Sequence, residues 1–410
     1  MARIIPIQAA PVLTDRSGGP LQPQWTQALP LALYVHVPWC LRKCPYCDFN
    51  SHEVKAGSEH PAGFDEDAYV AALIADLESS LPLVWGRRVS SIFFGGGTPS
   101  LLSPAAVDTL LAAFRARLPL APEAEITLEA NPGTAEAERF AGYRAAGVNR
   151  LSLGIQSFTD SQLQTLGRVH DSAQAHRAIE LAAQHFETFN LDLMVALPGQ
   201  DVTAALAEVA TALSYQPPHL SCYQLTIEPN TRYAVTPPPG LPDDDTQADI
   251  LDAVEARLAA AGYRHYETSA YARPGHACRH NLNYWQFGDY LGIGAGAHGK
   301  LTLPERGVLR QMRWKQPKEY LARVAAGQPV QSEELVAAEE LPFEFFMNAL
   351  RLADGFPPEL FAARTGLPLS LVLPTLRQAA ADGLLELGAE RIAPTERGRR
   401  LLNALLERFL

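Results

Sequence analysis

The sequence predicts an α/β protein built on a partial barrel of six parallel strands, followed by a mainly helical, winged-helix-like domain at the C-terminus. Short apolar runs suited to buried strands recur at intervals of roughly 30–40 residues, and most are separated by stretches with apolar residues at helical spacing. Repeated strand–helix–strand units are right-handed and produce a parallel sheet. Because six strands fall short of the eight in a closed barrel, we expect the sheet to be curved and partly open.

The strands and helices follow one another regularly up to about residue 235. Two amphipathic stretches in this part, Asp67–Leu81 and Pro104–Leu118, are expected helices, and a third covers Thr246–Ala261 after a proline-rich loop. The expected strands are Leu33–Val37, Val89–Phe94, Glu125–Glu129, Arg150–Gly154, Asn190–Val195 and Leu220–Thr226.

These patterns divide the chain into four parts. Residues 1–30, rich in Pro and Gln, are expected to form a loose arm, and residues 31–235 form the partial barrel. Residues 236–332 extend the barrel and include a glycine-rich segment near Gly288–Gly299, and residues 333–410 form the helical domain. Residues 341–410 contain eight Arg, no Lys and eight acidic residues. This balance favours a structural cap, because DNA binding requires a basic face.

Composition narrows the class of protein further. The 410 residues are 47% hydrophobic and 19% charged, with 34 basic and 45 acidic residues and a net charge of −11. This composition can fill a core, and the acidic balance argues against general binding of nucleic acid or anionic lipid. Pro6, Gln8 and Pro11 interrupt the apolar N-terminus, and no apolar run approaches a membrane span. Five cysteines do not form a disulfide framework. We therefore expect a cytoplasmic protein with no integral membrane segment and no nucleic-acid partner.

Three of the cysteines, Cys40, Cys44 and Cys47, form a CxxxCxxC segment directly after the first expected strand. The segment therefore opens at the carboxyl end of the sheet, where α/β folds place ligands. Thiolates are soft ligands for iron–sulfur clusters and for zinc. Structural zinc would need a fourth ligand, which His36 or His52 could supply, and this alternative stays open. Three thiolates on a four-iron cluster would instead leave one iron free for an exchangeable ligand.

This segment resembles the signature of the radical S-adenosylmethionine (SAM) superfamily, in which the open iron binds the amino and carboxylate groups of SAM. From about residue 31 to the end, the chain is similar to the oxygen-independent coproporphyrinogen III oxidase family, and within it to the haem-chaperone branch known as HemW. The motifs that carry the resemblance are YVHVPWC (34–40), FFGGGTPS (93–100), LEANPGT (128–134), GIQSF (154–158), LGRVH (166–170), DLMVALPGQ (192–200), HNLNYW (280–285) and GIGAGAHG (292–299).

The resemblance implies a radical SAM partial barrel that holds a [4Fe-4S] cluster on the three cysteines and binds SAM beside it. The chemistry of the matched side chains suits this ligand: Gly95–Thr98 allow a close approach, Glu129 can accept from an ammonium group, and Arg168 suits a carboxylate. Gln156 and Asp192 suit ribose hydroxyls. The expected SAM residues are Tyr34, Tyr46, Gly96, Gly97, Thr98, Glu129, Gln156, Arg168 and Asp192.

One position separates the two activities of the family. The coproporphyrinogen dehydrogenases carry a further cysteine two residues after the third cluster cysteine, and Phe49 occupies that position here. A phenylalanine cannot donate a proton, a hydrogen atom or a thiolate. We therefore assign no catalytic residue, and expect a haem chaperone that binds haem as cargo and passes it to an acceptor protein not identified by the sequence. A redox-active cluster would also require an electron donor.

The expected haem site is the HNxxYW segment, a feature of the chaperone branch. His280 could ligate haem iron, and Tyr284 and Trp285 could pack on a porphyrin face. The alternative is a loop histidine bonded to backbone, with both aromatic side chains in the core. Other possible haem ligands nearby are Tyr271, His276 and Cys278, whereas Cys222 is expected to be a buried structural thiol.

Three other functions stay open at this stage. The first is a coproporphyrinogen III dehydrogenase, against which Phe49 argues. The second is a radical SAM enzyme that modifies a tRNA or a peptide, and the third is a zinc protein that does not use SAM.

Overall fold

The computed structural model describes residues 21–54, 63–133 and 137–410. Six parallel strands form the centre of its main sheet: β1 (Leu31–Val37), β4 (Val89–Gly96), β5 (Leu120–Ala130), β6 (Arg150–Gln156), β7 (Thr188–Val195) and β8 (His219–Gln224). They lie side by side in chain order, and every neighbouring pair is parallel. The six predicted strands and their parallel arrangement are confirmed, and among the described residues the sheet is open, with two edges.

The sheet is wider than the sequence pattern predicted. The strand β11 (Asp289–Ile293) pairs parallel with β1, so a seventh parallel strand flanks the six. Antiparallel strands complete both edges: β12 (His298–Leu303), β13 (Gly307–Arg313) and β14 (Val330–Val336) beyond β11, and β10 (Ala270–Ala272) and β9 (Arg264–Glu267) beyond β8. The glycine-rich segment hides β11 and β12 from a pattern search. At Gly292 a Cβ atom would lie 1.9 Å from the His298 carbonyl oxygen, so glycine is required there.

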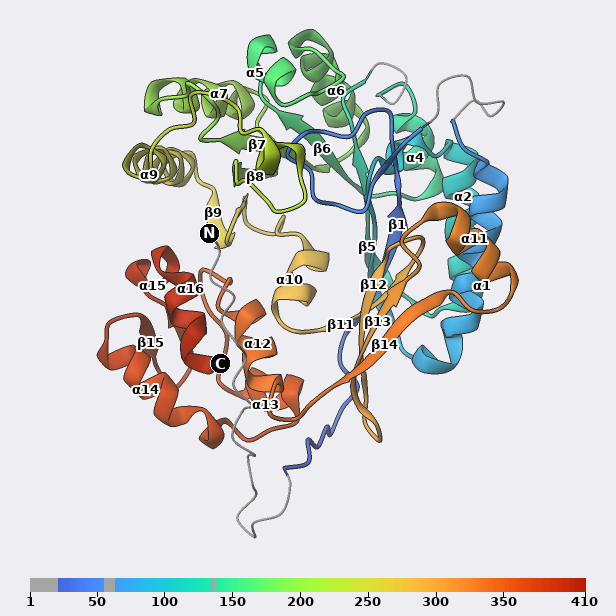
Figure 1. Ribbon diagram of the computed structural model, residues 1–410, viewed down its shortest axis with the longest axis vertical. Helices are drawn as coiled ribbons and strands as arrows, with labels where there is room; N and C mark the ends of the chain where they lie inside the picture. Colours follow the sequence, from blue (N-terminus) through green and yellow to red (C-terminus); the bar gives the residue numbers. More distant parts are fainter. Residues whose placement is uncertain (1–20, 55–62, 134–136) are drawn as a thin grey trace.

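Helices cover the outer side of the curved sheet, from α1 to α9 in Figure 1. The principal ones are α1 (Glu66–Val84), α2 (Pro104–Arg117), α4 (Phe140–Ala146), α5 (Asp160–Thr165), α6 (Ser172–His185), α7 (Val202–Ser214) and α9 (Asp244–Ala260). Five of them begin at a side chain that accepts a hydrogen bond from the backbone N–H three residues later, which satisfies a free donor of the first turn. These caps are Asp65, Ser103, Asp171, Asp201 and Asp243.

The C-terminal domain has its own aromatic core, which includes Phe345, Phe346, Phe356 and Phe361. Its elements are α12 (Leu341–Ala349), α13 (Glu359–Thr365), α14 (Leu373–Ala381), the antiparallel hairpin β15 (Leu385–Leu387) and β16 (Ile392–Pro394), α15 (Glu396–Arg400) and α16 (Leu402–Leu406). The predicted helical character is confirmed, and the hairpin after α14 corresponds to a wing. The first helix starts at Leu341 rather than near Glu333, because β14 extends to Val336.

The described part of the N-terminal arm is not loose. The Gln24 N–H donates to the Gly366 carbonyl oxygen at 2.9 Å, and the Trp25 indole donates to the Arg364 carbonyl oxygen at 3.0 Å. Leu21 and Trp25 also pack against the C-terminal core, so burial of apolar surface holds this segment in place. Residues 1–20 of the predicted arm lie outside the described residues.

The HNxxYW motif forms a short helix, α10 (Arg279–Trp285), between the main sheet and the C-terminal domain (Figure 1). It contacts β1, β4 and β11 on one side and α12 on the other. Within the described ranges, we find no helix that is both long and apolar enough to cross a membrane.

Candidate cluster, cofactor and haem sites

The three cysteines of the CxxxCxxC segment line one cavity of about 570 Å³, and all three are partly buried. The backbone holds the loop in a tight course: the Cys47 N–H donates to the Cys44 carbonyl oxygen at 3.2 Å, and the Val54 N–H donates to that of Cys40 at 2.9 Å. Burial raises the pKa of the Cys40 and Cys47 thiols, so without a metal these two groups are protonated. Binding of an iron–sulfur cluster would stabilise their thiolates.

A single zinc ion fits these residues poorly. The two ring nitrogens of His36 lie 3.0 Å from the Tyr34 hydroxyl and 2.9 Å from the Asn50 carbonyl oxygen, so this ring has no free nitrogen. The His52 Nε2 lies 3.3 Å from the Lys315 carbonyl oxygen. In the part of the chain that the structure describes, no three His, Cys, Asp or Glu side chains are gathered closely enough to hold one ion. Three thiols around a cavity suit a larger cluster.

The glycines after β4 allow its end to approach the cysteine loop. A Cβ atom on Gly97 would lie 2.5 Å from the Trp39 carbonyl oxygen, and one on Gly96, whose φ is +115°, would lie 2.6 Å from the His36 ring. The Thr98 hydroxyl accepts a hydrogen bond from the Asn131 side-chain amide at 3.0 Å. Bare backbone at this position forms a cradle beside the thiols, as the close approach of a ligand requires.

Glu129 lies near the end of β5, and its carboxylate accepts a hydrogen bond from the Gly96 N–H at 3.2 Å. Burial, reinforced by the charge of Asp192, raises the pKa of Glu129 to about 8. The ligand-free protein therefore holds this carboxyl mostly protonated at neutral pH. A ligand ammonium group beside Glu129 would favour its ionised form.

Replacing Glu129 with glutamine tests this proton. An unfolded carboxyl titrates near pH 4.3, so from about pH 5 to about pH 8 the folded state holds one more proton than the unfolded state. The stability of the ligand-free protein should therefore fall as the pH rises through this window, by at most about 1.4 kcal/mol per pH unit from this group. We expect Glu129→Gln to remove this part of the slope in urea unfolding, and to weaken SAM binding at least about tenfold. Identical slopes for both proteins would contradict the assignment.

Three further side chains line the same cavity: Gln156 at the end of β6, Asp192 within β7, and Arg168 from the loop between α5 and α6. The Asp192 carboxylate accepts from the Asn190 amide at 2.7 Å and the Ser152 hydroxyl at 3.1 Å. Gln156 adopts a positive φ of 62°. Its Oε1 atom is buried with no partner among the described residues, and a hydrogen bond from a bound ligand would satisfy this acceptor. Arg168 lies 3.5 Å from the Cys44 sulfur.

The structure thus brings nearly all the expected SAM residues together with the three cysteines in this first cavity, which Tyr46, Gly96, Gly97, Thr98, Glu129, Gln156, Arg168 and Asp192 line. Sequence reasoning missed Asn131, whose side chain joins Thr98 to Arg168 with a hydrogen bond of 2.5 Å to the guanidinium. The sequence signal that could have identified Asn131 is its position two residues after Glu129, just after the end of the same strand. Tyr34 does not line this cavity.

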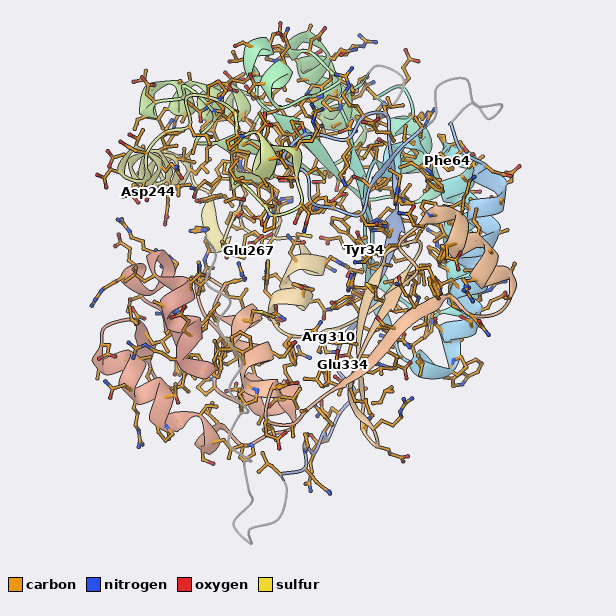
Figure 2. The ribbon with its side chains drawn as sticks, in the orientation of Figure 1. Tyr34, Phe64, Asp244, Glu267, Arg310 and Glu334 are labelled. Carbon is orange, nitrogen blue, oxygen red and sulfur yellow. The ribbon has the colours of Figure 1, made fainter. Side chains whose placement is uncertain are left out.

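Tyr34 instead lines a second cavity of about 480 Å³. Figure 2 shows Tyr34 beside α10, and its ring centroid lies 6.3 Å from that of His280. The two cavities share Phe49, Gly96 and Glu129, so they are neighbours across this wall. The other residues that line the second cavity are His36, Asn50, His280, Tyr284, Tyr290, Gly296 and His298.

His280 and Tyr284 face this second cavity together because they are four residues apart on a helix. The Nδ1 atom of His280 lies 3.2 Å from the Ser91 hydroxyl, and burial lowers its pKa to about 3, so the ring is neutral. Trp285 lines neither cavity; it packs against the C-terminal core, with the Arg351 guanidinium 5.4 Å from its ring. Its position on the other face of α10 explains this difference.

The alternative haem ligands are engaged elsewhere. The Cys278 sulfur lies 3.4 Å from a Glu125 oxygen, His276 lies 3.1 Å from the Thr188 hydroxyl, and the Tyr271 ring stacks on His265. Cys222 is buried in β8 with a thiol pKa raised to about 12, as a structural thiol would be. Sequence reasoning missed His298, which is exposed, lines the second cavity and has no side-chain hydrogen bond within the described ranges.

Comparisons with known proteins agree with this geometry. Residues 34–208 match the family model described as Radical SAM superfamily, and residues 336–401 match the HemN C-terminal domain. The chain is 51% identical to the heme chaperone HemW of Escherichia coli (strain K12) and 48% identical to that of Haemophilus influenzae, in each case over 93% of this chain and 98% of the relative.

A solved structure supports the fold. The coproporphyrinogen III oxidase HemN of Escherichia coli superposes with a TM-score of 0.77 at 24% identity, covering 93% of this chain and 90% of that chain. At this identity the likeness concerns the fold alone. Membership of the superfamily implies a [4Fe-4S] cluster and SAM as cofactors, and the donor set of the first cavity fits both. With a cysteine loop, a glycine cradle and relatives that match it almost end to end, the chain belongs to the HemW family of the radical SAM superfamily.

Proposed function

We propose that this protein is a haem chaperone that holds haem in the second cavity and passes it to an acceptor protein. The observation that carries the proposal is the lining of this cavity, where the His280 imidazole lies among the rings of Tyr34, Tyr284 and Tyr290. A neutral imidazole is the usual nitrogen ligand of haem iron, and aromatic rings suit the faces of a porphyrin. The names of the HemW relatives support the same assignment.

The surroundings of His280 favour ligation through Nε2. Its Nδ1 lies 3.2 Å from the Ser91 hydroxyl, and a partner of this kind fixes the ring orientation of a metal-bound histidine. The Phe93 ring, 4.8 Å from the imidazole, restricts it further. Because the ring is neutral, an iron ion does not have to displace a proton.

The cluster and SAM belong to the first cavity in this proposal. Cys40, Cys44 and Cys47 would hold the [4Fe-4S] cluster, and Glu129 and Arg168 would orient the amino and carboxylate groups of SAM. When bound, the cluster supplies one-electron chemistry and one open iron. Phe49 and Glu129 line both cavities, so a change in their positions when SAM binds would also change the wall of the haem site.

Haem titration of a His280→Ala variant tests the assignment. We expect the haem affinity, followed by the Soret band, to fall at least about tenfold, since the variant removes the iron ligand. His276→Ala is the matched control, because His276 lines neither cavity and should leave the titration unchanged. An unchanged spectrum and affinity for His280→Ala would exclude this ligand.

Wild-type protein loaded with cluster and SAM tests the dehydrogenase alternative. With a strong reductant and coproporphyrinogen III, we expect no loss of CO₂ in the mass spectrum, because the exposed Phe49 ring offers no ionisable group beside the cluster loop. Successive decarboxylated products would overturn the chaperone proposal. Capture experiments with the haem-loaded protein would identify the acceptor protein.

A further inference from the structure

Arg150 is a buried charged group that neither the cluster nor the expected SAM residues use. It begins β6, and its side chain lines the first cavity on the same face of the strand as Ser152, Gly154 and Gln156. The residue is only 3% exposed. Its guanidinium makes no hydrogen bond and no ion pair with any residue that the structure describes, and its Nε is buried without a partner.

The carboxylates near Arg150 are bonded to other groups. Glu125 and Asp192 exert an electrostatic effect on Arg150 but accept hydrogen bonds from other donors. Glu129, which also feels the charge of Arg150, accepts from the Gly96 N–H. Glu125 accepts from the backbone N–H groups of Arg279 and His280, each at 3.2 Å. Asp192 accepts from Asn190 and Ser152, so none of these carboxylates is a direct partner of the guanidinium.

Other polar side chains that line the same cavity form hydrogen bonds with one another. The ring nitrogens of His219 lie 2.6 Å from Asn190 Oδ1 and 2.8 Å from the Tyr266 hydroxyl, which also accepts from the Cys278 N–H at 3.2 Å. The Ser221 hydroxyl donates to the same Asn190 oxygen at 3.1 Å. Of the groups named here, the guanidinium alone lacks a partner among the described residues; the Thr127 hydroxyl, opposite Arg150 on β5, is also buried without one. Buried arginines are normally paired, because an unpaired buried charge is strongly destabilising.

Arg150 enters the first cavity from a different position than Arg168, which is expected to hold the SAM carboxylate. Arg168 donates to the Gly154 carbonyl oxygen and lies beside Cys44. Four residues of strand separate Gly154 from Arg150, a distance of about 13 Å. The first cavity therefore receives one arginine beside the cysteine loop and a second one from the amino-terminal end of β6.

We propose that Arg150 is the anchor for an aliphatic carboxylate of a second ligand, bound in the first cavity beyond the SAM site. A guanidinium binds a carboxylate through two parallel hydrogen bonds, and it would supply the partner that Arg150 lacks. The inference goes beyond the proposed function, since it concerns a different cavity and does not require haem. The two cavities adjoin across Phe49, Gly96 and Glu129, and Asn281, the residue after His280, lines the first, so a propionate that extends from a haem held by His280 is one source of this group. A free small acid is the other.

The first experiment uses sodium propionate as the probe on protein loaded with cluster and SAM. We expect propionate at tens of millimolar, compared with chloride at equal ionic strength, to raise the thermal midpoint of the wild type but not of Arg150→Gln. Arg117→Gln, which removes a partly exposed arginine paired with Glu78 outside both cavities, is the matched control and should respond as the wild type does. Without propionate, Arg150→Gln should be at least as stable as the wild type, because an unpaired buried charge has been removed.

The second experiment separates the two sources by titrating haem and haem dimethyl ester. If a haem propionate binds Arg150, Arg150→Gln should weaken haem binding about tenfold and leave binding of the ester unchanged. If the ligand is a free acid, only the propionate effect on stability should be lost. If the wild type binds no haem but is still stabilised by propionate, the chaperone function is refuted, whereas the assignment of Arg150 as a carboxylate anchor is not.

Two results would overturn the proposal. One is a wild-type protein on which propionate has no effect and which binds haem as Arg150→Gln does. The other is an Arg150→Gln variant that is less stable than the wild type with no effect of propionate on either protein, since this pattern identifies a structural counter-charge. If Arg150→Gln does not fold, Arg150→Lys replaces it in the propionate and haem comparisons and should respond more weakly than the wild type, because lysine keeps the charge but loses the paired donors.

Discussion

A Cys44→Ser variant is expected to lose its iron. The wild type, reconstituted without oxygen, should carry about four irons per chain, whereas the variant should retain less than about one, because two thiolates cannot hold the cluster. Cys40→Ser and Cys47→Ser should behave alike, since all three sulfurs line one cavity. Iron and sulfide analysis, with the visible absorption of the cluster, provides the measurement.

The chain offers a matched control for this result. Cys222 is a buried thiol in β8 with a pKa raised to about 12, so Cys222→Ser also exchanges sulfur for oxygen but should keep the full iron content. SAM binding should fall with the iron in the three loop variants and stay intact in the control. A Cys44→Ser protein with four irons would show that the loop does not hold the cluster.

The largest loss of stability is expected from Arg313→Met. Arg313 on β13 and Asp76 on α1 form an ion pair of 3.1 Å, and both side chains are fully buried. The Asp76 carboxylate also accepts from the Tyr320 hydroxyl at 2.9 Å and the Gly294 N–H at 3.1 Å. Removing the guanidinium leaves a buried carboxylate without its cation, which costs about 3–5 kcal/mol.

Urea unfolding tests this expectation through the midpoint at unchanged slope. The control is Arg391→Met, which breaks a surface pair with Glu386 in which both side chains are more than half exposed. That change should cost less than about 1 kcal/mol. Equal effects of the two substitutions would show that the buried pair does not join α1 to the antiparallel edge of the sheet.

The sequence was sufficient where the pattern is local or repeats along the chain. The six parallel strands follow from apolar runs and helical spacing, and parallel strands bring their carboxyl ends to one edge. For this reason Glu129, Gln156 and Asp192, which lie far apart in the chain, could be assigned to one site with the cysteine loop, and the structure places all of them around the first cavity.

The strands of the sheet edges and the directions of single aromatic side chains were not predictable in this way. The strand β1 is buried on both faces, so its sequence carries no alternation to show that Tyr34 points toward α10. The helical turn at 279–285 sends Trp285 into the C-terminal core, away from His280 and Tyr284. A reading of the segment as a loop could not distinguish these faces.

By itself, then, the sequence determined the family fold, the cysteine loop and most of the groups around the first cavity, because short spacings and strand ends encode them. Only the tertiary structure decided that Tyr34 and His298 belong to a second cavity, that residues 21–25 pack against the C-terminal domain, and that Arg150 is buried with no partner among the described residues. The physical reason is that the presence or absence of a partner depends on contacts between residues distant in the chain, which no local pattern records.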